Sequence, residues 1–178
     1  MNLIQTLTHQ IEVSRLWQKQ ITINRNEYLK RGGTTDTNLY FVAQGSLRIF
    51  VMDGEEEHTI RFGYQNSLIT ALDSFVNDTP SDFYIQAIKK TNLKVITKKA
   101  FMDFVEKDKN TLQLWHKILG QLICQQLERE KDLLTSSPLQ RYQRVLERSP
   151  HLFQEIPNKY IASYLRMTPE TLSRLKKV

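Results

Sequence analysis

The 178-residue sequence predicts an α+β protein: an N-terminal antiparallel β-roll of the double-stranded β-helix (jelly-roll) type, a long helix, and a C-terminal helical domain. Three observations predict this fold. Short runs with a two-residue apolar period fill the first hundred positions, a sustained helical repeat follows, and two short helical patterns with a tight joint end the chain. The predicted domains span residues 1–109, 110–136 and 137–178.

The strands of the roll are predicted from the alternation of apolar and polar residues. One or two short helices within residues 2–16 are expected to precede them. Asp53-Gly54 stands between two alternating runs, which is a strong hairpin signal, and Glu55 to Glu57 at its tip are expected to form a solvated loop. Strands are expected from Gln20 and over residues 39–42, 47–52, 58–62, 67–71, 83–88 and 93–97. Many short strands at regular spacing favour an antiparallel barrel, sandwich or roll.

A long helix is predicted from Asn110, its expected N-cap, to Thr135, about 39 Å at 1.5 Å per residue. One apolar stripe repeats at intervals of three and four, as in the seam of a parallel coiled-coil homodimer. The predicted seam consists of Leu112, Trp115, Leu119, Leu122 and Gln126. A second stripe (Leu114, Ile118 and Ile123) is expected to pack on the roll. The alternative is that the first stripe packs only against the roll.

The last stretch of the chain predicts a helix-turn-helix. Apolar residues recur at helical spacing in its first half (Ile161, Ala162 and Leu165) and in its second half (Leu172 and Leu175). Between them, Thr168 is a hydroxyl N-cap, and Pro169 occupies the first helical position, where its missing N–H costs nothing. A second helix that starts there must turn away from the first.

The outward face of the second helix carries side chains that can read DNA. Glu170, Ser173 and Arg174 lie at i, i+3 and i+4 and therefore share one face. Arginine can bind guanine in a fork, glutamate can accept from cytosine, and serine can bind a base or a phosphate. The other predicted DNA-binding residues are Thr168, Thr171, Lys159, Arg166, Lys176 and Lys177, of which the four cations are expected to hold phosphates. The alternative is an ordinary amphipathic helix pair with a solvated basic face.

The distribution of charge favours DNA as a partner. The chain has a net charge of +6, with 25 basic and 19 acidic residues. Eight of the basic residues but only three of the acidic ones follow residue 136. A phosphate-binding module explains this asymmetry, whereas a solvated helix face does not.

Other classes of function find little support in the sequence. Cys124 is the only cysteine and the four histidines are far apart, so no metal site, cofactor or catalytic residue is predicted. We find no phosphate-binding loop and no nucleophile elbow. No apolar run approaches the roughly 20 residues that span a bilayer, and the N-terminus does not read as a signal peptide. A cytoplasmic protein without enzymatic activity is expected.

The run IASYLRMTPETLSRLKK resembles the helix-turn-helix of Crp/Fnr-type bacterial transcription regulators, whose recognition helix carries a Glu-x-x-Ser-Arg element. Glu170, Ser173 and Arg174 match this element, whereas Arg166 stands where the family usually has glycine. The order of roll, long helix, Ser-Pro hinge and helix-turn-helix is also that of the family. The resemblance therefore implies that the roll is a cyclic-nucleotide-binding-like sensor domain.

Cyclic-nucleotide-binding relatives hold the ribose with a carboxylate and the cyclic phosphate with an arginine. A gap-free alignment places Ala71 at the carboxylate position and Ser81, followed by Asp82, at the arginine position. A phosphate buried there would lack a cation, so we expect no binding of cyclic AMP in the family manner. Tyr64, Gln65, Ser67, Thr70 and Ser81 are the candidates for a neutral polar pocket. A roll filled by its own side chains, or activity set by abundance alone, remain the alternatives.

The sequence therefore predicts a sequence-specific DNA-binding transcriptional regulator. It is expected to act as a homodimer through residues 110–136, with recognition helices about 34 Å apart on a near-palindromic site. Double-stranded DNA, a second copy of the chain, an unidentified small-molecule effector and RNA polymerase are the partners that follow from the resemblance. The alternative is an effector-binding β-roll module whose helix-turn-helix is vestigial or binds protein.

Overall fold

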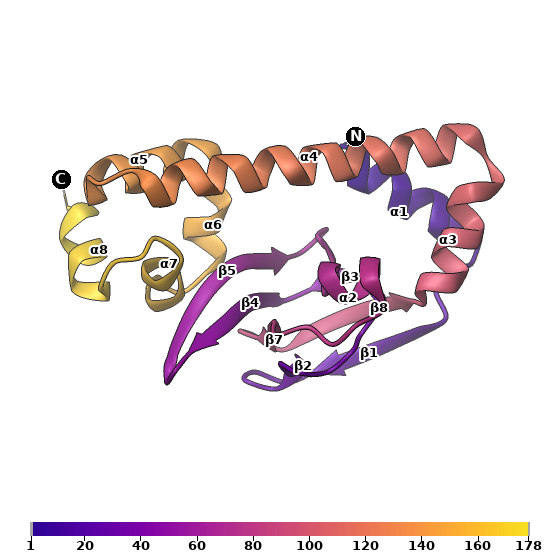
Figure 1. Ribbon diagram of the computed structural model, residues 1–178, viewed down its shortest axis with the longest axis horizontal. Helices are drawn as coiled ribbons and strands as arrows, with labels where there is room; N and C mark the ends of the chain where they lie inside the picture. The colour runs from indigo at the N-terminus through magenta and orange to yellow at the C-terminus, as the bar shows by residue number, and fades with distance from the viewer. Residues whose placement is uncertain (1, 178) are drawn as a thin grey trace.

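The computed structural model of the protein describes residues 2–177. Met1 and Val178, the outer ends of the first and last predicted domains, lie outside the described residues. The long helix α4 (Lys109–Leu134) runs along one side of the molecule. The β-roll lies against its N-terminal half, and the C-terminal helices lie against its other end (Figure 1).

Two four-stranded antiparallel sheets make up the roll within residues 2–177, in the orders β1-β8-β3-β6 and β2-β7-β4-β5. Most neighbours in these orders are distant in sequence, so the chain passes repeatedly from one sheet to the other, as the predicted fold class requires. The strands are β1 (Lys19–Ile23), β2 (Tyr28–Lys30), β3 (Leu39–Gln44), β4 (Ser46–Asp53), β5 (Glu56–Tyr64), β6 (Leu68–Ile69), β7 (Tyr84–Ala87) and β8 (Thr91–Ile96).

The predicted strand pattern is confirmed, except that β2 was not predicted and the strand expected over residues 67–71 is shorter. The Asp-Gly turn joins β4 to β5, and Gly54 has a positive φ of 59°, which glycine adopts without a steric cost. The strand expected over residues 67–71 is only two residues long, because its two residues pair with Tyr40 and Phe41 and the chain then enters the short helix α2 (Leu72–Asn77). The sequence did not predict α2.

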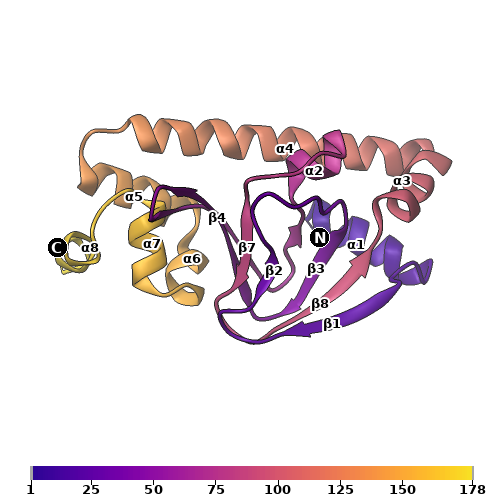
Figure 2. The ribbon, with the colours of Figure 1, turned by 60° about the horizontal axis from the view of Figure 1, so that its bottom comes forward.

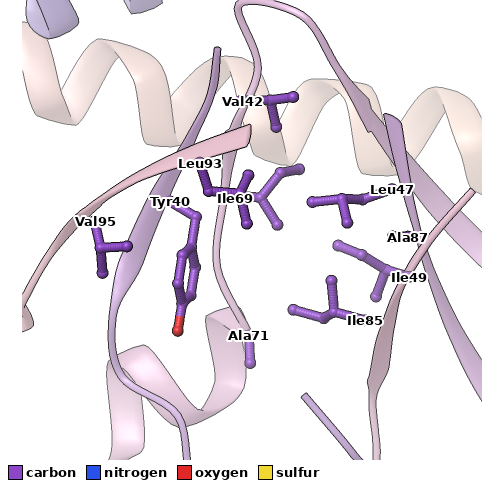
Figure 3. Close-up of a cluster of buried hydrophobic side chains, with 10 residues drawn as sticks. All are labelled: Tyr40, Val42, Leu47, Ile49, Ile69, Ala71, Ile85, Ala87, Leu93 and Val95. Carbon is purple, nitrogen blue, oxygen red and sulfur yellow. The ribbon is translucent and has the colours of Figure 1, made fainter. Parts of the chain in front are cut away.

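The space between the two sheets is filled by apolar side chains. Ten buried residues form this core, and Figure 3 shows them gathered between the strands that carry them. Ala71, at the start of α2, is one of them and is fully buried. The core residues are Tyr40, Val42, Leu47, Ile49, Ile69, Ala71, Ile85, Ala87, Leu93 and Val95.

A second core joins the roll to helices α1 (Leu3–Val13), α3 (Lys98–Lys107) and the first half of α4. A single helix, α1, forms within residues 2–16, and its N-cap Asn2 and third residue Gln5 cap each other's backbone amides. The predicted N-cap of α4 was wrong by two residues. Asp108, not Asn110, caps the helix, because its carboxylate accepts hydrogen bonds from the amide and the hydroxyl of Thr111 at 2.8 and 2.9 Å.

The stripe assigned to the dimer seam faces inward over the first half of α4. Trp115 is only 7% exposed and packs edge-on against Phe101 at a centroid distance of 4.9 Å. Leu112 and Leu119 are partly buried against the same core, together with Leu114 and Ile118 of the second stripe. Leu122 is half-buried and Gln126 is exposed. The first part of the predicted seam, Leu112 to Leu119, therefore stabilises the chain's own fold, because aromatic residues of α2 and α3 cover it.

The C-terminal region consists of α5 (Pro138–Arg148), α6 (Pro150–Glu155), α7 (Asn158–Tyr164) and α8 (Pro169–Leu175). Ser137 caps α5 and Pro138 occupies its first turn, as the Ser-Pro signal indicates. A third core fills the space among these helices and includes Ile88 of the roll. The helical region thus packs on the roll as well as on itself.

Candidate nucleic-acid interface and effector region

The joint between α7 and α8 is closed by local hydrogen bonds. Arg166 has a positive φ of 53°, the left-handed conformation that the turn requires and that costs a residue with a side chain about 1 kcal/mol. Its position lets the amide of Met167 donate to the carbonyl of Ala162 at 3.0 Å. The hydroxyl of Thr168 then accepts from the amide of Thr171 at 3.2 Å, which confirms it as the N-cap of α8.

The apolar faces of both helices are buried as the sequence predicts. Ile161, Ala162 and Leu165 of the first helix and Leu172 of the second are fully buried. Ala162 has the smallest side chain of this set and belongs to the same buried cluster as Leu172. The second helix is therefore held rigidly, and its opposite face points away from the protein.

That opposite face presents the three residues of the predicted reading element. Glu170, Ser173 and Arg174 are all exposed. Within the described chain, neither Glu170 nor Arg174 forms an ion pair. Glu170 also lies in the first turn of α8, where a carboxylate favours the helix dipole. An edge with one acceptor, one hydroxyl and one guanidinium is thus free to meet the edges of base pairs.

The predicted phosphate-binding cations occupy different surroundings. Lys159 and Lys177 are exposed, and Lys159 lies over the ring of Tyr160. Lys176 donates to the side chain of Asn158 at 2.5 Å, which ties the end of α8 to the start of α7. Arg166 points at the β4–β5 hairpin, where its Nη1 lies 2.5 Å from Nδ1 of His58. Arg166 therefore joins the turn to the roll in this arrangement.

Other cations of the C-terminal segment are engaged inside the protein. Asp132 of α4 is fully buried and accepts from Nε of Arg144 at 2.9 Å and from Arg148. Arg141 is buried and donates to the carbonyls of Thr135 and Arg166. The charge asymmetry in the sequence therefore overstates the charge that faces solvent, because three of the eight cations help to hold α5 in place.

The roll and the helix-turn-helix meet along β5. The side chain of Ser163 bonds to the backbone of Glu57 and Thr59, and the rings of Phe62 and Tyr164 lie 5.5 Å apart. Figures 1 and 2 both show the end of the β4–β5 hairpin beside α7. This contact ties α7, which precedes α8, to the roll.

The acidic tip of the hairpin is not simply a solvated loop. Glu57 belongs to β5, and its carboxylate lies 2.6 Å from Nη1 of Arg48. Arg48 is buried, donates twice to Oε1 of Gln86, and stacks over Tyr160 of α7. The carboxylate of Glu57 therefore neutralises a cation buried between the roll and the C-terminal helices.

The five residues predicted to line an effector pocket do not act together. Gln65 is exposed in a turn, where the hydroxyl of Ser67 accepts from the amide of Tyr64 at 3.1 Å. Ser81 is buried and its hydroxyl accepts from the amide of Phe83, while Thr70 carries a buried hydroxyl without a partner among the described residues. Tyr64 borders a cavity of about 240 Å³, and the other four residues do not line it.

A buried lysine that sequence reasoning missed lies next to Ser81. Lys30 is almost fully buried, and its ammonium donates to the carbonyls of Ser81 and Phe83, each at 2.8 Å, and to that of Arg31 at 3.0 Å. Burial lowers the pKa of this ammonium. All three of its protons are used, so a phosphate at this corner would gain no free donor from it. Ala71, at the expected carboxylate position, lies in the apolar core.

Comparison with known proteins identifies the family to which the roll belongs. Residues 20–108 match the family model of the cyclic nucleotide-binding domain. No curated protein matches the sequence. Among residues 2–177, no helix is both long enough and apolar enough to cross a bilayer.

Solved structures with the same fold include three bacterial proteins. A CooA variant from Carboxydothermus hydrogenoformans is 18% identical over 99% of this chain and 83% of its own, with a TM-score of 0.75. The c-di-GMP responsive global regulator CLP of Xanthomonas campestris is 13% identical over 96% and 90%, with a TM-score of 0.70. The catabolite activator protein of Thermus thermophilus is 17% identical over 95% and 81%, with a TM-score of 0.60. These likenesses confirm the predicted order of roll, long helix and C-terminal helices.

Proposed function

Because this chain belongs to the cyclic nucleotide-binding domain family and has the fold of Crp/Fnr-type regulators over nearly its whole length, we propose that it is a sequence-specific DNA-binding transcriptional regulator that acts as a homodimer. The observation that carries the proposal is the face of α8. Its capped N-terminus holds Glu170, Ser173 and Arg174 outward on a helix whose other side is fully packed.

In this function each side chain of the face has a separate role. Arg174 reads guanine through O6 and N7, Glu170 accepts from cytosine, and Ser173 contacts a base or a phosphate. Lys159, Lys176 and Lys177 hold the DNA backbone, with Thr168 and Thr171 at the N-terminus of the helix. Arg166 reaches a phosphate only when it leaves His58, since its guanidinium is engaged there.

The homodimer forms along a face of α4 that the sequence did not assign to the partner, and the prediction that Ile123 packs on the roll was wrong, because its side chain is exposed. Ile123, Leu127 and Leu134 are 62%, 53% and 77% exposed, and they follow one another at intervals of four and seven. Gly120 precedes them by three residues and has open space around its α-carbon. These positions form a continuous stripe with a heptad spacing, so we assign the partner contact within residues 110–136 to this stripe.

Selection of bound sites from random duplex DNA tests the proposal. The expected result is a near-palindromic site with half-sites one helical turn apart, because two-fold symmetry in the protein imposes it on the DNA. Retention of DNA without any enriched sequence would contradict base reading. Absence of duplex binding would favour the alternative, an effector-binding module whose helix-turn-helix binds protein.

A further inference from the structure

A cavity of about 240 Å³ lies where the roll, the long helix and the C-terminal helices meet. β5 contributes one wall, α4 a second, and the α5–α6 junction with α7 a third. It is separate from the apolar core between the sheets, since none of the ten core residues lines it. Its lining residues are Ile60, Arg61, Phe62, Tyr64, Gln125, Gln126, Arg129, Arg148, Ser149, Leu152 and Tyr164.

Arg129 is the most unusual residue of this lining. Its side chain comes from α4, is only 6% exposed, and lies over the ring of Tyr164 at 3.7 Å. Its Nη1 is buried and has no hydrogen-bond partner within residues 2–177. Burial lowers the pKa of this guanidinium. A buried cation of this kind is costly unless an anion compensates it, and the protein part of the site supplies none in contact.

A second arginine, from β5, also lines the cavity. Arg61 of β5 donates from Nη2 to Oε1 of Gln125 at 3.1 Å, and burial lowers its pKa as well. No carboxylate within the described residues forms an ion pair with it. Arg148, also in the lining, is already held by Asp132. The cavity therefore has two guanidiniums whose charge no acidic side chain in contact offsets.

The other lining residues indicate the chemistry of the uncharged part of a ligand. Ile60, Phe62 and Leu152 present apolar and aromatic surface, and Tyr64 and Tyr164 add two phenol rings. Drug-sized ligands occupy roughly 300–1,000 Å³, so a cavity of about 240 Å³ takes a smaller molecule. Two guanidiniums in one cavity lining suit a group with two negative charges and several acceptor oxygens, and arginine forks match phosphate in this way.

We propose that this cavity binds a small phosphate monoester, with the phosphoryl group between Arg61 and Arg129 and an apolar body against Phe62 and Tyr64. The ligand contacts β5, α4, the α5–α6 junction and α7 together. Its binding therefore strengthens the packing of the helix-turn-helix against the roll. This site differs in place and in residues from the interior of the roll. It does not depend on whether the chain binds DNA.

The test is calorimetry of the full chain with phenyl phosphate, in 150 mM salt so that general attraction to a basic protein is screened. At pH 7.5 the monoester is close to its doubly charged form. We expect binding to the wild-type protein and at least tenfold weaker binding to Arg129→Gln and Arg61→Gln. The matched control is Arg25→Gln, which removes an exposed arginine from a turn and should leave the affinity unchanged.

Two further probes identify the group that is recognised. Inorganic phosphate should bind more weakly than phenyl phosphate, because it lacks the apolar body. Succinate, a dianion without phosphorus, should bind at least tenfold more weakly, and equal affinity would overturn the assignment to phosphate. No heat with millimolar phenyl phosphate, or the same affinity in both arginine variants, would overturn the site itself.

Folding and DNA binding are kept apart from this readout. Circular dichroism establishes whether each variant is folded. If Arg129→Gln is not folded, the affinity of Arg61→Gln for phenyl phosphate tests the site. Arg174→Ala should bind phenyl phosphate like the wild-type protein, since Arg174 lies outside the cavity lining. Failure of the ligand site would therefore leave DNA reading untouched, and failure of DNA reading would leave the ligand site untouched.

Discussion

The hydroxyl of Ser163 in α7 donates to the carbonyl oxygen of Glu57 in β5 at 3.0 Å. The same hydroxyl oxygen accepts from the amide of Thr59 at 3.1 Å. β5 is the last strand of its sheet, and a strand in that place leaves alternate backbone groups unpaired. One serine of the helix-turn-helix therefore satisfies two backbone groups of the β4–β5 hairpin and joins the two parts of the protein.

Replacing Ser163 with alanine should loosen this junction. Two hydrogen bonds are lost, each worth about 0.5–1.5 kcal/mol net, so the free energy of unfolding should fall by about 1–3 kcal/mol. Urea unfolding measures this fall, and amide exchange should show Thr59 less protected. Ser173→Ala, on the exposed face of α8, is the control and should change neither. Unaltered protection of Thr59 in Ser163→Ala would mean that the contact is not formed in solution.

Arg174→Ala and Lys177→Ala should weaken DNA binding in different ways. Loss of Arg174 should cost about 1–3 kcal/mol on the selected site and relax the preference at one base pair. Loss of Lys177 should weaken all sequences alike and lower the salt slope by about one. Titrations on the selected site and on a scrambled duplex at several salt concentrations separate the two. An equal loss on both duplexes for Arg174→Ala would rule out base reading by this residue.

Leu127→Lys and Trp115→Ala should separate association from folding. Leu127 is exposed on the proposed partner stripe, so a charge there should give a folded monomer. Trp115 lies in the core, so its truncation should lower the free energy of unfolding by about 3–5 kcal/mol. Sedimentation and thermal unfolding measure both properties. A folded Leu127→Lys dimer would show that the copies meet on another surface.

Tyr40 should give the protein a specific sensitivity to alkaline pH. Its hydroxyl donates to Oδ2 of Asp36 at 2.8 Å, and burial, followed by the negative charge of Asp36, raises the pKa of the phenol well above its ordinary value. An unfolded tyrosine loses its proton near pH 10, so above that pH deprotonation lowers the free energy of the unfolded chain before it can do so for the folded protein.

The contribution of this hydrogen bond is therefore present below about pH 10 and is lost as the pH rises toward the raised pKa. Urea unfolding of the wild-type protein and of Tyr40→Phe at pH 8 to 11 measures it. We expect the difference in stability between the two to shrink above pH 10. Two parallel curves would show that the phenol titrates alike in the folded and unfolded states.

Cyclic AMP should not bind in the roll. Ala71 cannot hold a ribose hydroxyl, and the three protons of Lys30 are already bound by backbone carbonyls. Calorimetry of the full chain with cyclic AMP should give no heat of binding at micromolar concentrations. Micromolar affinity, retained when Arg61 and Arg129 are replaced, would show that the interior of the roll opens to admit the nucleotide.

The sequence predicted the parts whose signal is local. The Asp-Gly hairpin, the alternating strands and the Thr168-Pro169 cap each depend on neighbouring residues and on well-defined backbone preferences. The exposed reading face of α8 followed from the same spacing. Helical periodicity also located α4, but it could not tell that the predicted seam would be covered within the chain. That cover comes from Phe75 and Phe101, which are separated from Trp115 in sequence.

The residues that sequence reasoning missed act through partners distant in the chain. Arg129 was not among the predicted site residues, yet it stacks on Tyr164 of the helix-turn-helix. Lys30 carries no motif, and only the fold brings Ser81 and Phe83 to its ammonium. The residues predicted to line an effector pocket do not come together, because some of them have local partners instead. The hydroxyls of Ser67 and Ser81 accept hydrogen bonds from nearby backbone amides.

Arg141, Arg144 and Arg148 are engaged inside the molecule, and this limits the affinity of a single subunit for duplex DNA. Few basic side chains near α8 are left without a partner inside the protein. The binding of one subunit would therefore release few counterions from the DNA. A single copy should then dissociate readily in the saline of a living cell. Durable occupancy of a promoter would come only from two copies seated together, which makes the abundance of the chain itself a control on its activity.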